Sequence, residues 1–181
     1  MATLEPLSPS LVAEFIAIRL RALEDTPSAF GSTYARESQL SPSDWRERAT
    51  LWNNGTTSFC RIAMDRADES ANSTNKREPC GIAAGYLDKS ALSPPNLASM
   101  WVAPTHRRSG LGTRLVAEVE RWAQTIGAAE LRLMVTSQNA AAISFYQRCG
   151  FVLSGRTEPY PNDPALFEYE MIKSLHDPTR I

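Results

Sequence analysis

Cysteine and histidine are scarce in this sequence, which has three cysteines and two histidines among 181 residues. Cys60, Cys80 and Cys149 are odd in number and irregular in spacing, so they do not form a disulfide framework. Neither CxxC nor HExxH occurs, and with only His106 and His176 available we expect no metal site. Cys60 and Cys80 fall on two candidate neighbouring strands, but we expect buried thiols in a reducing compartment, the cytoplasm, rather than a bridge.

The sequence also lacks an excess of either charge and a long apolar run. Lysine and arginine total 19, aspartate and glutamate total 20, and the formal net charge is −1. No overall field therefore favours nucleic acid or an anionic membrane, and no apolar run approaches the roughly 20 residues that span a bilayer. The first residues, MATLEPLSPS, lack the basic and apolar regions of a secretory signal. We expect a cytoplasmic monomer or homodimer with no membrane or nucleic-acid partner.

The composition is that of an ordinary globular domain, with 43% hydrophobic and 22% charged residues. The length suits one domain with a sizeable core. We place this domain at residues 1–175 and expect a frayed tail at 176–181. The segment RADESANSTNKR (66–77) has almost nothing to bury and is predicted to be a mobile hairpin loop.

Capping residues and hydrophobic periodicity predict the order of the elements. Ser8-Pro9 and Ser41-Pro42 each place a hydroxyl cap before a proline at the first helical position, so the N-terminal quarter is predicted to be mostly helical. Apolar residues at helical spacing predict a helix over 111–126, and Asn139 is placed to cap another over 140–148. Apolar and β-rich segments predict strands at 56–65, 78–87, 97–102, 130–135, 151–158 and 165–172.

The segment MWVAPTHRRSGLGTRLVAEVERW, which starts at Met100, predicts an anion-binding site. A strand stops at Pro104, two arginines and two glycines follow, and then a helix begins. The start of a helix presents unpaired N–H groups and a partial positive charge, which bind phosphates. Gly110 and Gly112 remove side chains that would hold a phosphate off the backbone. The Walker pattern is absent, and the dinucleotide pattern fails because Leu115 stands at its third glycine.

This site resembles the coenzyme A site of the GNAT acetyltransferase superfamily. The family signature Gln/Arg-x-x-Gly-x-Gly/Ala is matched by Arg107, Gly110 and Gly112, after the usual valine and proline. A second family signature, Asn-x-x-Ala-x-x-Phe-Tyr-x-x-x-Gly-Phe, is matched by Asn139, Ala142, Phe145, Tyr146, Gly150 and Phe151. Both signatures stand in the family's order, separated by a predicted helix and strand. A segment at 22–34 is also similar to a subset of these enzymes.

The resemblance implies a fold, a cosubstrate and a set of contacts. The fold is α/β (α+β): a mixed, mostly antiparallel twisted sheet of six or seven strands with helices on both faces. A right-handed crossover would make the strands at 97–102 and 130–135 parallel, with coenzyme A in the splay between them. The cosubstrate is acetyl-CoA, and no metal is involved. The residues expected to contact it are Met100, Trp101, Val102, Arg107, Arg108, Ser109, Gly110, Leu111, Gly112, Thr113, Asn139, Ala142, Phe145 and Tyr146.

Acetyl transfer from a thioester to an amine requires a donor for the oxyanion and a proton for the departing sulfur. Asn139, Ala142 and Tyr146 share one face of an ideal helix, and a phenol with a pKa near 10 can donate to a thiolate. The family implies this same catalytic role for Tyr146. The alternative is a core tyrosine that packs beside Phe145. The oxyanion donor is expected to be a backbone N–H near Met100 to Val102.

The base is not evident, since the strand NLASMWV carries no carboxylate. Glu37, Glu168 and Glu170 are candidates, or Asn96 and Ser99 order a water molecule. A lysine amine is neutral in about one molecule in 2,500 at pH 7, and its deprotonation costs about 4.6 kcal/mol. An α-amino group costs only about 1 to 1.4 kcal/mol. We therefore expect a small-molecule amine or a protein N-terminus as acceptor rather than an internal lysine.

The acceptor is expected to be bound by the N-terminal segment, through Phe30, Tyr34 and Glu37. Two readings other than an N-acetyltransferase remain open from the residues alone. One is a non-catalytic module that binds or senses acyl-CoA. The other is a nucleotide-binding protein that uses the same helix end. Arg148 is either a contact for the adenosine 3′-phosphate or a helix-end arginine that favours the dipole.

Overall fold

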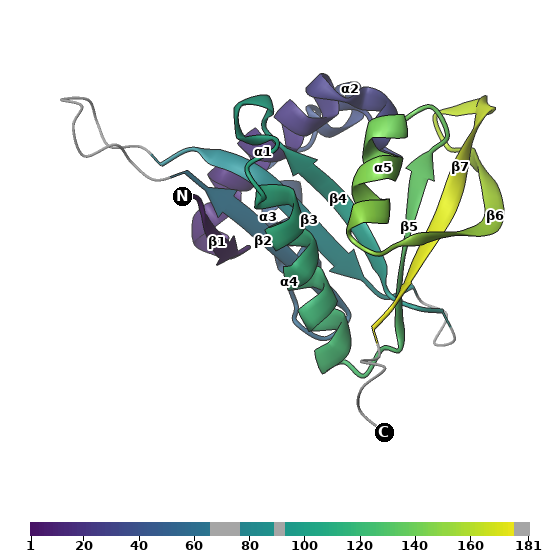
Figure 1. The fold of residues 1–181 in the computed structure, drawn as a ribbon. Coiled ribbons are helices and arrows are strands. Elements are labelled where there is room, and N and C mark those ends of the chain that lie inside the picture. Colours follow the sequence, from purple (N-terminus) through teal and green to yellow (C-terminus); the bar gives the residue numbers. More distant parts are fainter. Residues whose placement is uncertain (66–76, 89–92, 176–181) are drawn as a thin grey trace.

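The structure, a computed structural model, describes residues 1–65, 77–88 and 93–175. Most of the predicted loop at 66–77 and the predicted tail at 176–181 lie outside the described residues. The described chain forms a seven-stranded sheet with the order β1-β2-β3-β4-β5-β7-β6 (Figure 1). The strands are β1 (Thr3–Pro6), β2 (Ser58–Met64), β3 (Pro79–Tyr86), β4 (Asn96–Val102), β5 (Glu130–Thr136), β6 (Val152–Tyr160) and β7 (Asp163–Ser174).

Neighbouring strands pair antiparallel except β4 and β5, which are parallel. The prediction of a mixed, mostly antiparallel sheet is therefore confirmed, and so is the parallel pair across the crossover helix. β1 was not predicted. It is four residues long, lies at the sheet edge and ends in a proline, and a segment this short offers no clear alternation for a pattern to detect.

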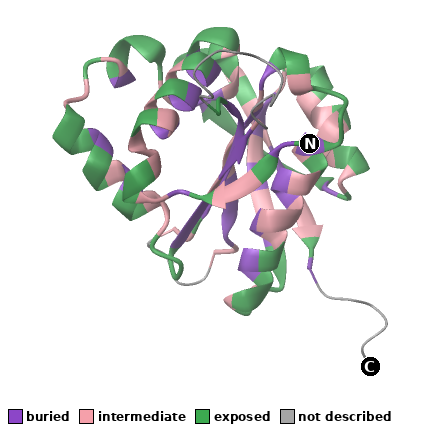
Figure 2. Cartoon of the chain, turned by 90° about the vertical axis from the view of Figure 1, so that its left-hand side faces the viewer, coloured by how far each residue is buried: buried purple, intermediate pink, exposed green. Residues whose placement is uncertain are grey.

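Helices cover both faces of the sheet. They are α1 (Val12–Asp25), α2 (Tyr34–Glu37), α3 (Pro42–Trp52), α4 (Leu111–Thr125) and α5 (Ala140–Arg148), with 3-10 turns η1 (Pro9–Leu11), η2 (Pro27–Ala29) and η3 (Pro104–His106). Figure 1 shows α4 and α5 in front of the sheet and α1 and α3 behind it. The central strands are buried between these layers, while the helices turn exposed residues outward (Figure 2).

The core forms where helices pack on the central strands. On one face α4 buries Leu115, Val119 and Trp122. Gly85 of β3 makes room for this helix, since a Cβ atom there would lie 2.5 Å from the Trp122 ring. On the other face the ring of Phe15 in α1 packs edge-on against Trp45 in α3, with centroids 5.4 Å apart.

β4 departs from regular geometry at two places. Its pairing with β5 is limited to Asn96 opposite Arg132, and beyond this pair the strands diverge. Toward β3, the register shifts between Ile82 and Ala84, and Ser99 has a φ of 52°. The second feature is a bulge, in which an extra residue is left without a ladder partner. β4 therefore has no register partner on β5 beyond Asn96, and it has one extra residue relative to β3.

The three cysteines are free, as predicted. Cys60 on β2 and Cys80 on β3 do lie on neighbouring strands. Burial raises the pKa of the Cys60 thiol to about 12 and that of Cys80 to about 11, so neither is a thiolate at neutral pH. No helix within the described ranges combines the length and the apolar character needed to cross a bilayer.

Candidate active site

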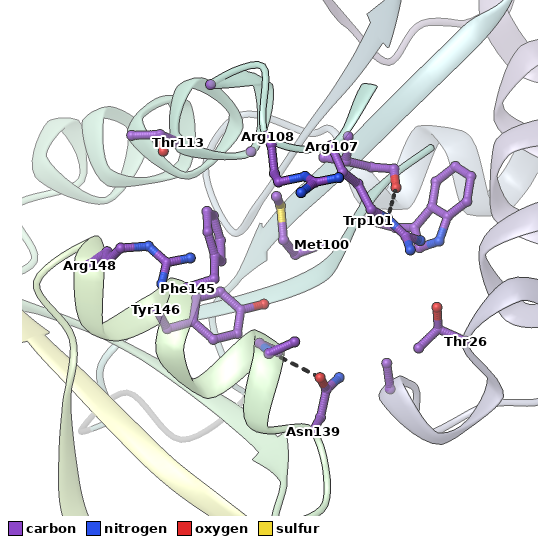
Figure 3. Close-up of a pocket in the computed structure, with 16 residues that line it drawn as sticks. Thr26, Met100, Trp101, Arg107, Arg108, Thr113, Asn139, Phe145, Tyr146 and Arg148 are labelled. Carbon is purple, nitrogen blue, oxygen red and sulfur yellow. Dashed lines mark hydrogen bonds between the residues drawn. The ribbon is translucent and has the colours of Figure 1, made fainter. Parts of the chain in front are cut away.

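A cleft of about 570 Å³ opens where β4, the start of α4 and α5 meet (Figure 3). Its walls come from η2 with the residue before it, the C-terminal half of β4, the loop into α4 with the first turn of that helix, and α5 with its N-cap. The residues that line it are Thr26, Ala29, Met100, Trp101, Val102, Arg107, Arg108, Gly110, Gly112, Thr113, Asn139, Ala141, Ala142, Phe145, Tyr146 and Arg148.

Most of the residues predicted to contact the cosubstrate come together in this cleft. Two do not line it. Leu111 is 3% exposed and belongs to the core, and the Ser109 hydroxyl donates to the carbonyl oxygen of His106 at 2.6 Å. Thr26, Ala29 and Ala141 line the cleft but were not predicted. Thr26 and Ala29 belong to the segment 22–34, whose resemblance assigned them no role, and the packing of η2 near β5 brings them to the site.

The loop into α4 is built for close approach by a ligand. Arg108 and Gly110 have left-handed backbones, with φ of 61° and 83°. Gly110 is the N-cap and supplies no side-chain hydrogen bond to the helix. The first intrahelical bond runs from the Arg114 amide to the Gly110 carbonyl at 3.2 Å, so α4 cannot pair the amides that precede Arg114. These amides, with the helix dipole, favour an anion at this end of the cleft.

Gly112 sets the width of the cleft between α4 and α5. A Cβ atom at this position would lie 3.1 Å from Cζ of Phe145 and 3.3 Å from Cε of Met100. Both distances are tighter than ordinary van der Waals contacts. The glycine therefore lets the first turn of α4 approach α5 while leaving its backbone accessible.

The two arginines of the loop differ in their contacts. Arg107 donates through Nε to the Val102 carbonyl at 3.0 Å and pairs with Asp25 at the end of α1. Asp25 also accepts from Nε1 of Trp101 at 2.9 Å. The Arg108 side chain has no ion pair or hydrogen bond to any other described residue, and it reaches into the cleft above Met100 (Figure 3). Arg107 thus ties the loop to its scaffold, whereas Arg108 is available to a ligand.

Asp25 is held as a carboxylate by these contacts. Partial burial opposes its ionisation, but hydrogen bonds from Thr26, Trp101 and Arg107 hold its pKa below the usual value. A permanent negative charge at Asp25 fixes the Arg107 guanidinium and the Trp101 indole in place. Both residues border the cleft, so their positions are set before any ligand enters.

α5 presents Tyr146 to the same cleft. The Asn139 side chain accepts from the Ala142 amide at 3.0 Å, which confirms the predicted cap. The Tyr146 ring packs against Phe145 and Phe151, at 5.2 and 5.9 Å between centroids, and its hydroxyl points into the cleft between Met100 and Asn139 (Figure 3). Burial, with a smaller effect of Cys149, raises the pKa of the Tyr146 phenol above its usual value. Tyr146 is therefore a protonated phenol at neutral pH.

The three residues predicted to bind the acceptor do not line this cleft. Phe30 is 6% exposed, and its carbonyl accepts from the Tyr160 hydroxyl at 2.8 Å. Tyr34 is 44% exposed at the start of α2. Glu37 is buried between Arg19 and Arg48.

The candidate bases lie in contrasting surroundings. At Glu37, burial opposes ionisation, but hydrogen bonding and charge from Arg19 lower the pKa of the carboxyl. Glu170 accepts from the Ser154 hydroxyl at 2.8 Å and lies 3.7 Å from both Arg132 and Arg156. Glu168 is half-buried on β7, and burial together with the charge of Glu158 raises its pKa. Glu168 is thus the one of the three that has no ion pair with a described residue.

The described residues also show how the possible metal ligands and Cys149 are placed. Over the ranges that the structure describes, no three His, Cys, Asp or Glu side chains are grouped to hold a metal ion. Burial and the charge of Glu120 raise the pKa of the Cys149 thiol, which disfavours the nucleophilic thiolate.

Comparison with known proteins relates the chain to one family. The model of the Acetyltransferase (GNAT) family matches residues 27–151. The uncharacterized N-acetyltransferase YobR of Bacillus subtilis is 38% identical over 116 residues, which cover 59% of this chain and 47% of YobR. The peptidyl-lysine N-acetyltransferase YjaB of Salmonella typhimurium is 27% identical over 154 residues, 82% of this chain and 86% of YjaB.

The match to the rice acetyl transferase GW6a spans only 18% of that protein's length, at 35% identity over 41% of this chain. Among solved structures, a GNAT-family acetyltransferase from Streptococcus pneumoniae superposes with a TM-score of 0.74 at 21% identity, over 97% of this chain and 100% of that one. Spermidine N-acetyltransferase from Vibrio cholerae, in complex with CoA and spermine, gives 0.71 at 16% identity, over 96% and 95%. These two likenesses show the fold.

Proposed function

The chain belongs to the GNAT acetyltransferase family, and on that premise we propose that it transfers the acetyl group of acetyl-CoA to a primary amine, by direct attack within a ternary complex. One observation carries the proposal: the open amides at the start of α4 and the hydroxyl of Tyr146 face the same cleft. The first feature suits a diphosphate and the second suits a departing thiolate. We assign this activity to residues 1–175 as a single domain.

The cleft fits the long, anionic shape of acetyl-CoA. Amides from Ser109 to Thr113 would bind the diphosphate, with Arg108 adding charge-assisted donors. Met100 to Val102 would pair with the pantetheine arm as with an added strand, because β5 leaves β4 after Asn96. Arg148, at the far end of α5, lines the same cleft and would meet the adenosine 3′-phosphate.

The residues of the chain then act on the thioester in defined ways. The acceptor nitrogen forms a bond to the acetyl carbon, and the C–S bond breaks. A backbone N–H near Met100 donates to the carbonyl oxygen as negative charge develops there. Tyr146 gives its proton to the sulfur, and a base takes a proton from the attacking amine.

Glu168 does not line the cleft, and we infer that it is the base from the register of the strands and from its lack of an ion pair with a described residue. It lies opposite Thr136 in the β5–β7 register. On the neighbouring strands β4 and β5, Asn96 pairs with Arg132. Counted from this pair, Met100 is four residues further along β4, and Thr136 is four residues further along β5. Glu168 therefore lies toward the same end of the sheet as Met100, on the strand next to β5. From this position it would take the amine proton through water.

A pH profile tests this assignment through Glu158, which faces Glu168 across the β6–β7 pair. The Glu158 charge contributes to the raised pKa of Glu168. A base with a raised pKa loses activity as the pH falls through that pKa, so the Glu158→Gln variant should move the acid limb of kcat/KM to lower pH. The exposed Glu130→Gln variant on β5 is the control. If the acid limb of kcat/KM lies at the wild-type pH in both Glu158→Gln and Glu168→Gln, Glu168 is not the base.

The function itself is tested by thiol release from acetyl-CoA with a panel of amines. The panel contains spermidine, an aminoglycoside, a peptide with a free N-terminus and an N-terminally blocked lysine peptide. We expect amine-dependent release, fastest with the amines of lower pKa. Release that is fastest with the lysine peptide contradicts the acceptor class, and no amine-dependent release with any acyl acceptor contradicts transferase activity.

A further inference from the structure

Ser99 occupies an unusual position in β4. Its φ of 52° lies in the left-handed region, which residues other than glycine avoid. The register places Trp101 opposite Ile82 and Ala98 opposite Ala84, so Ser99 and Met100 together face one residue of β3. This bulge immediately precedes the backbone amides that the proposed function assigns to the oxyanion. A strained conformation of this kind persists only where its surroundings hold it.

A single arginine from α1 holds the Ser99 side chain. Arg19 donates through Nη1 to the Ser99 hydroxyl oxygen at 3.2 Å, from a residue 80 positions earlier in the chain. The Arg19 side chain is only 6% exposed. The bond therefore runs from the buried layer of helices behind the sheet to the bulge in β4.

The Arg19 guanidinium is itself fixed on every side. Its Nε and Nη2 donate to the two carboxylate oxygens of Glu37, at 3.0 and 2.7 Å. Arg48 pairs with Oε2 of the same carboxylate at 2.7 Å. The rings of Phe30 and Trp52 lie 5.0 and 5.4 Å from the guanidinium carbon. With Nε and Nη2 bound to Glu37, Nη1 is directed at Ser99.

The buried charges of Arg19 and Glu37 are not explained by fold stability alone, because removing charges from water costs free energy. Buried ion pairs are often no more stabilising than apolar residues of the same volume. A planar guanidinium clamped by a bidentate carboxylate, in contrast, fixes one direction in space. Here the fixed guanidinium orients its hydrogen bond to Ser99, next to the proposed catalytic site.

We propose that Arg19, clamped by Glu37 and Arg48, is a positioning residue that holds the left-handed bulge at Ser99 and thereby aims the following β4 amides at the acyl oxygen. This inference rests on the proposed function for its catalytic consequence. Its structural part, the conformation of residue 99, stands independently. Arg19 does not line the cosubstrate cleft, and its hydrogen bond to β4 is the one to Ser99, so we assign its effect to Ser99.

The test uses the fact that glycine adopts a positive φ without a Cβ clash. Ser99→Ala removes the bond while keeping the clash, and we expect kcat to fall about 10-fold or more, since a displacement of about 1 Å can cost about 100-fold. The kcat of Arg19→Met should be lowered by a similar factor. The kcat of the double variant Arg19→Met/Ser99→Ala should be no lower than that of either single variant. Ser99→Gly should restore kcat to within about threefold of wild type, also when combined with Arg19→Met. Arg61→Met, which removes an arginine paired with Glu118 on the other helical layer, is the control.

One further measurement separates the conformation of residue 99 from catalysis. Backbone NMR shifts of residue 99 in the unliganded protein should report the left-handed conformation in wild type and Ser99→Gly and its loss in Ser99→Ala. If kcat and these shifts are unchanged in Ser99→Ala, or if Ser99→Gly does not restore a loss, the inference is overturned. Ser99→Ala leaves the buried pair intact, so it decides the matter even where Arg19→Met does not fold. A wild type that is inactive with every amine contradicts the proposed function, and the shifts still decide whether Arg19 holds the bulge.

Discussion

Replacement of Tyr146 by phenylalanine is expected to lower kcat by about 100- to 10,000-fold, the usual contribution of a general acid. The affinity for CoA should change by less than about threefold, because the ring keeps its packing against Phe145 and Phe151. The hydroxyl is the only group removed, and it faces the cleft (Figure 3). Thiol-release kinetics and calorimetry with CoA measure the two quantities separately.

The pH dependence of the wild type sharpens this expectation. Burial raises the pKa of Tyr146 above its usual value, so the proton that it donates is retained throughout the neutral range. Loss of this proton should not lower the rate below about pH 10. Tyr34→Phe is the matched control, since Tyr34 is exposed on α2 and does not line the cleft. A Tyr146→Phe enzyme with wild-type kcat contradicts the role of Tyr146. A wild type that binds CoA without turnover supports the sensing module instead.

Substitution of Gly112 by valine is expected to weaken CoA binding by about 30- to 100-fold. Even a single Cβ atom would lie 3.1 Å from the Phe145 ring, and overpacking of this kind costs about 1–3 kcal/mol, where about 1.4 kcal/mol is a factor of ten in affinity. Either α5 moves away or the branched side chain turns over the amides of the first turn. The helix itself should not suffer, because valine has a higher helix propensity than glycine. Calorimetry measures the affinity, and thermal unfolding checks the fold.

The loss of CoA affinity at position 112 should increase with the size of the side chain. Gly112→Ala adds only the Cβ atom, which Phe145 accommodates by a shift of a few tenths of an ångström, so its affinity should lie between those of wild type and Gly112→Val. Gly31→Val is the matched control, since a Cβ atom there meets nothing closer than Pro161 at 3.8 Å. Equal affinities for Gly112→Val and wild type would place the diphosphate away from this helix.

The parts of the site that come from contiguous segments could be predicted from the sequence. Gly110 and Gly112 stand at a helix start, and Tyr146 shares a helix face with Asn139, so local geometry predicts each part. That the two parts meet at one cosubstrate was implied by the family resemblance. The different tasks of Arg107 and Arg108 could not be predicted, because they depend on Asp25, 82 residues away from Arg107 in the chain. The same holds for Thr26 and Ala29, which reach the cleft only through tertiary packing.

The fold shows the same division. Helices with caps and periodic apolar residues were predicted close to their observed ends, for example 111–126 against Leu111–Thr125. The bulge at Ser99 had no signal, since serine is not the residue that a left-handed backbone selects. We propose that Arg19 holds its conformation, and no local pattern links Arg19 to a residue 80 positions later in the chain. Glu37 was expected at the acceptor, but its carboxylate is occupied by two arginines of other helices.

The most direct test of the account is a crystal structure of the protein with CoA. We expect the diphosphate to accept hydrogen bonds from the amides between Ser109 and Thr113, and the sulfur to lie near the hydroxyl of Tyr146. A diphosphate bound at any other place on the chain would contradict the account.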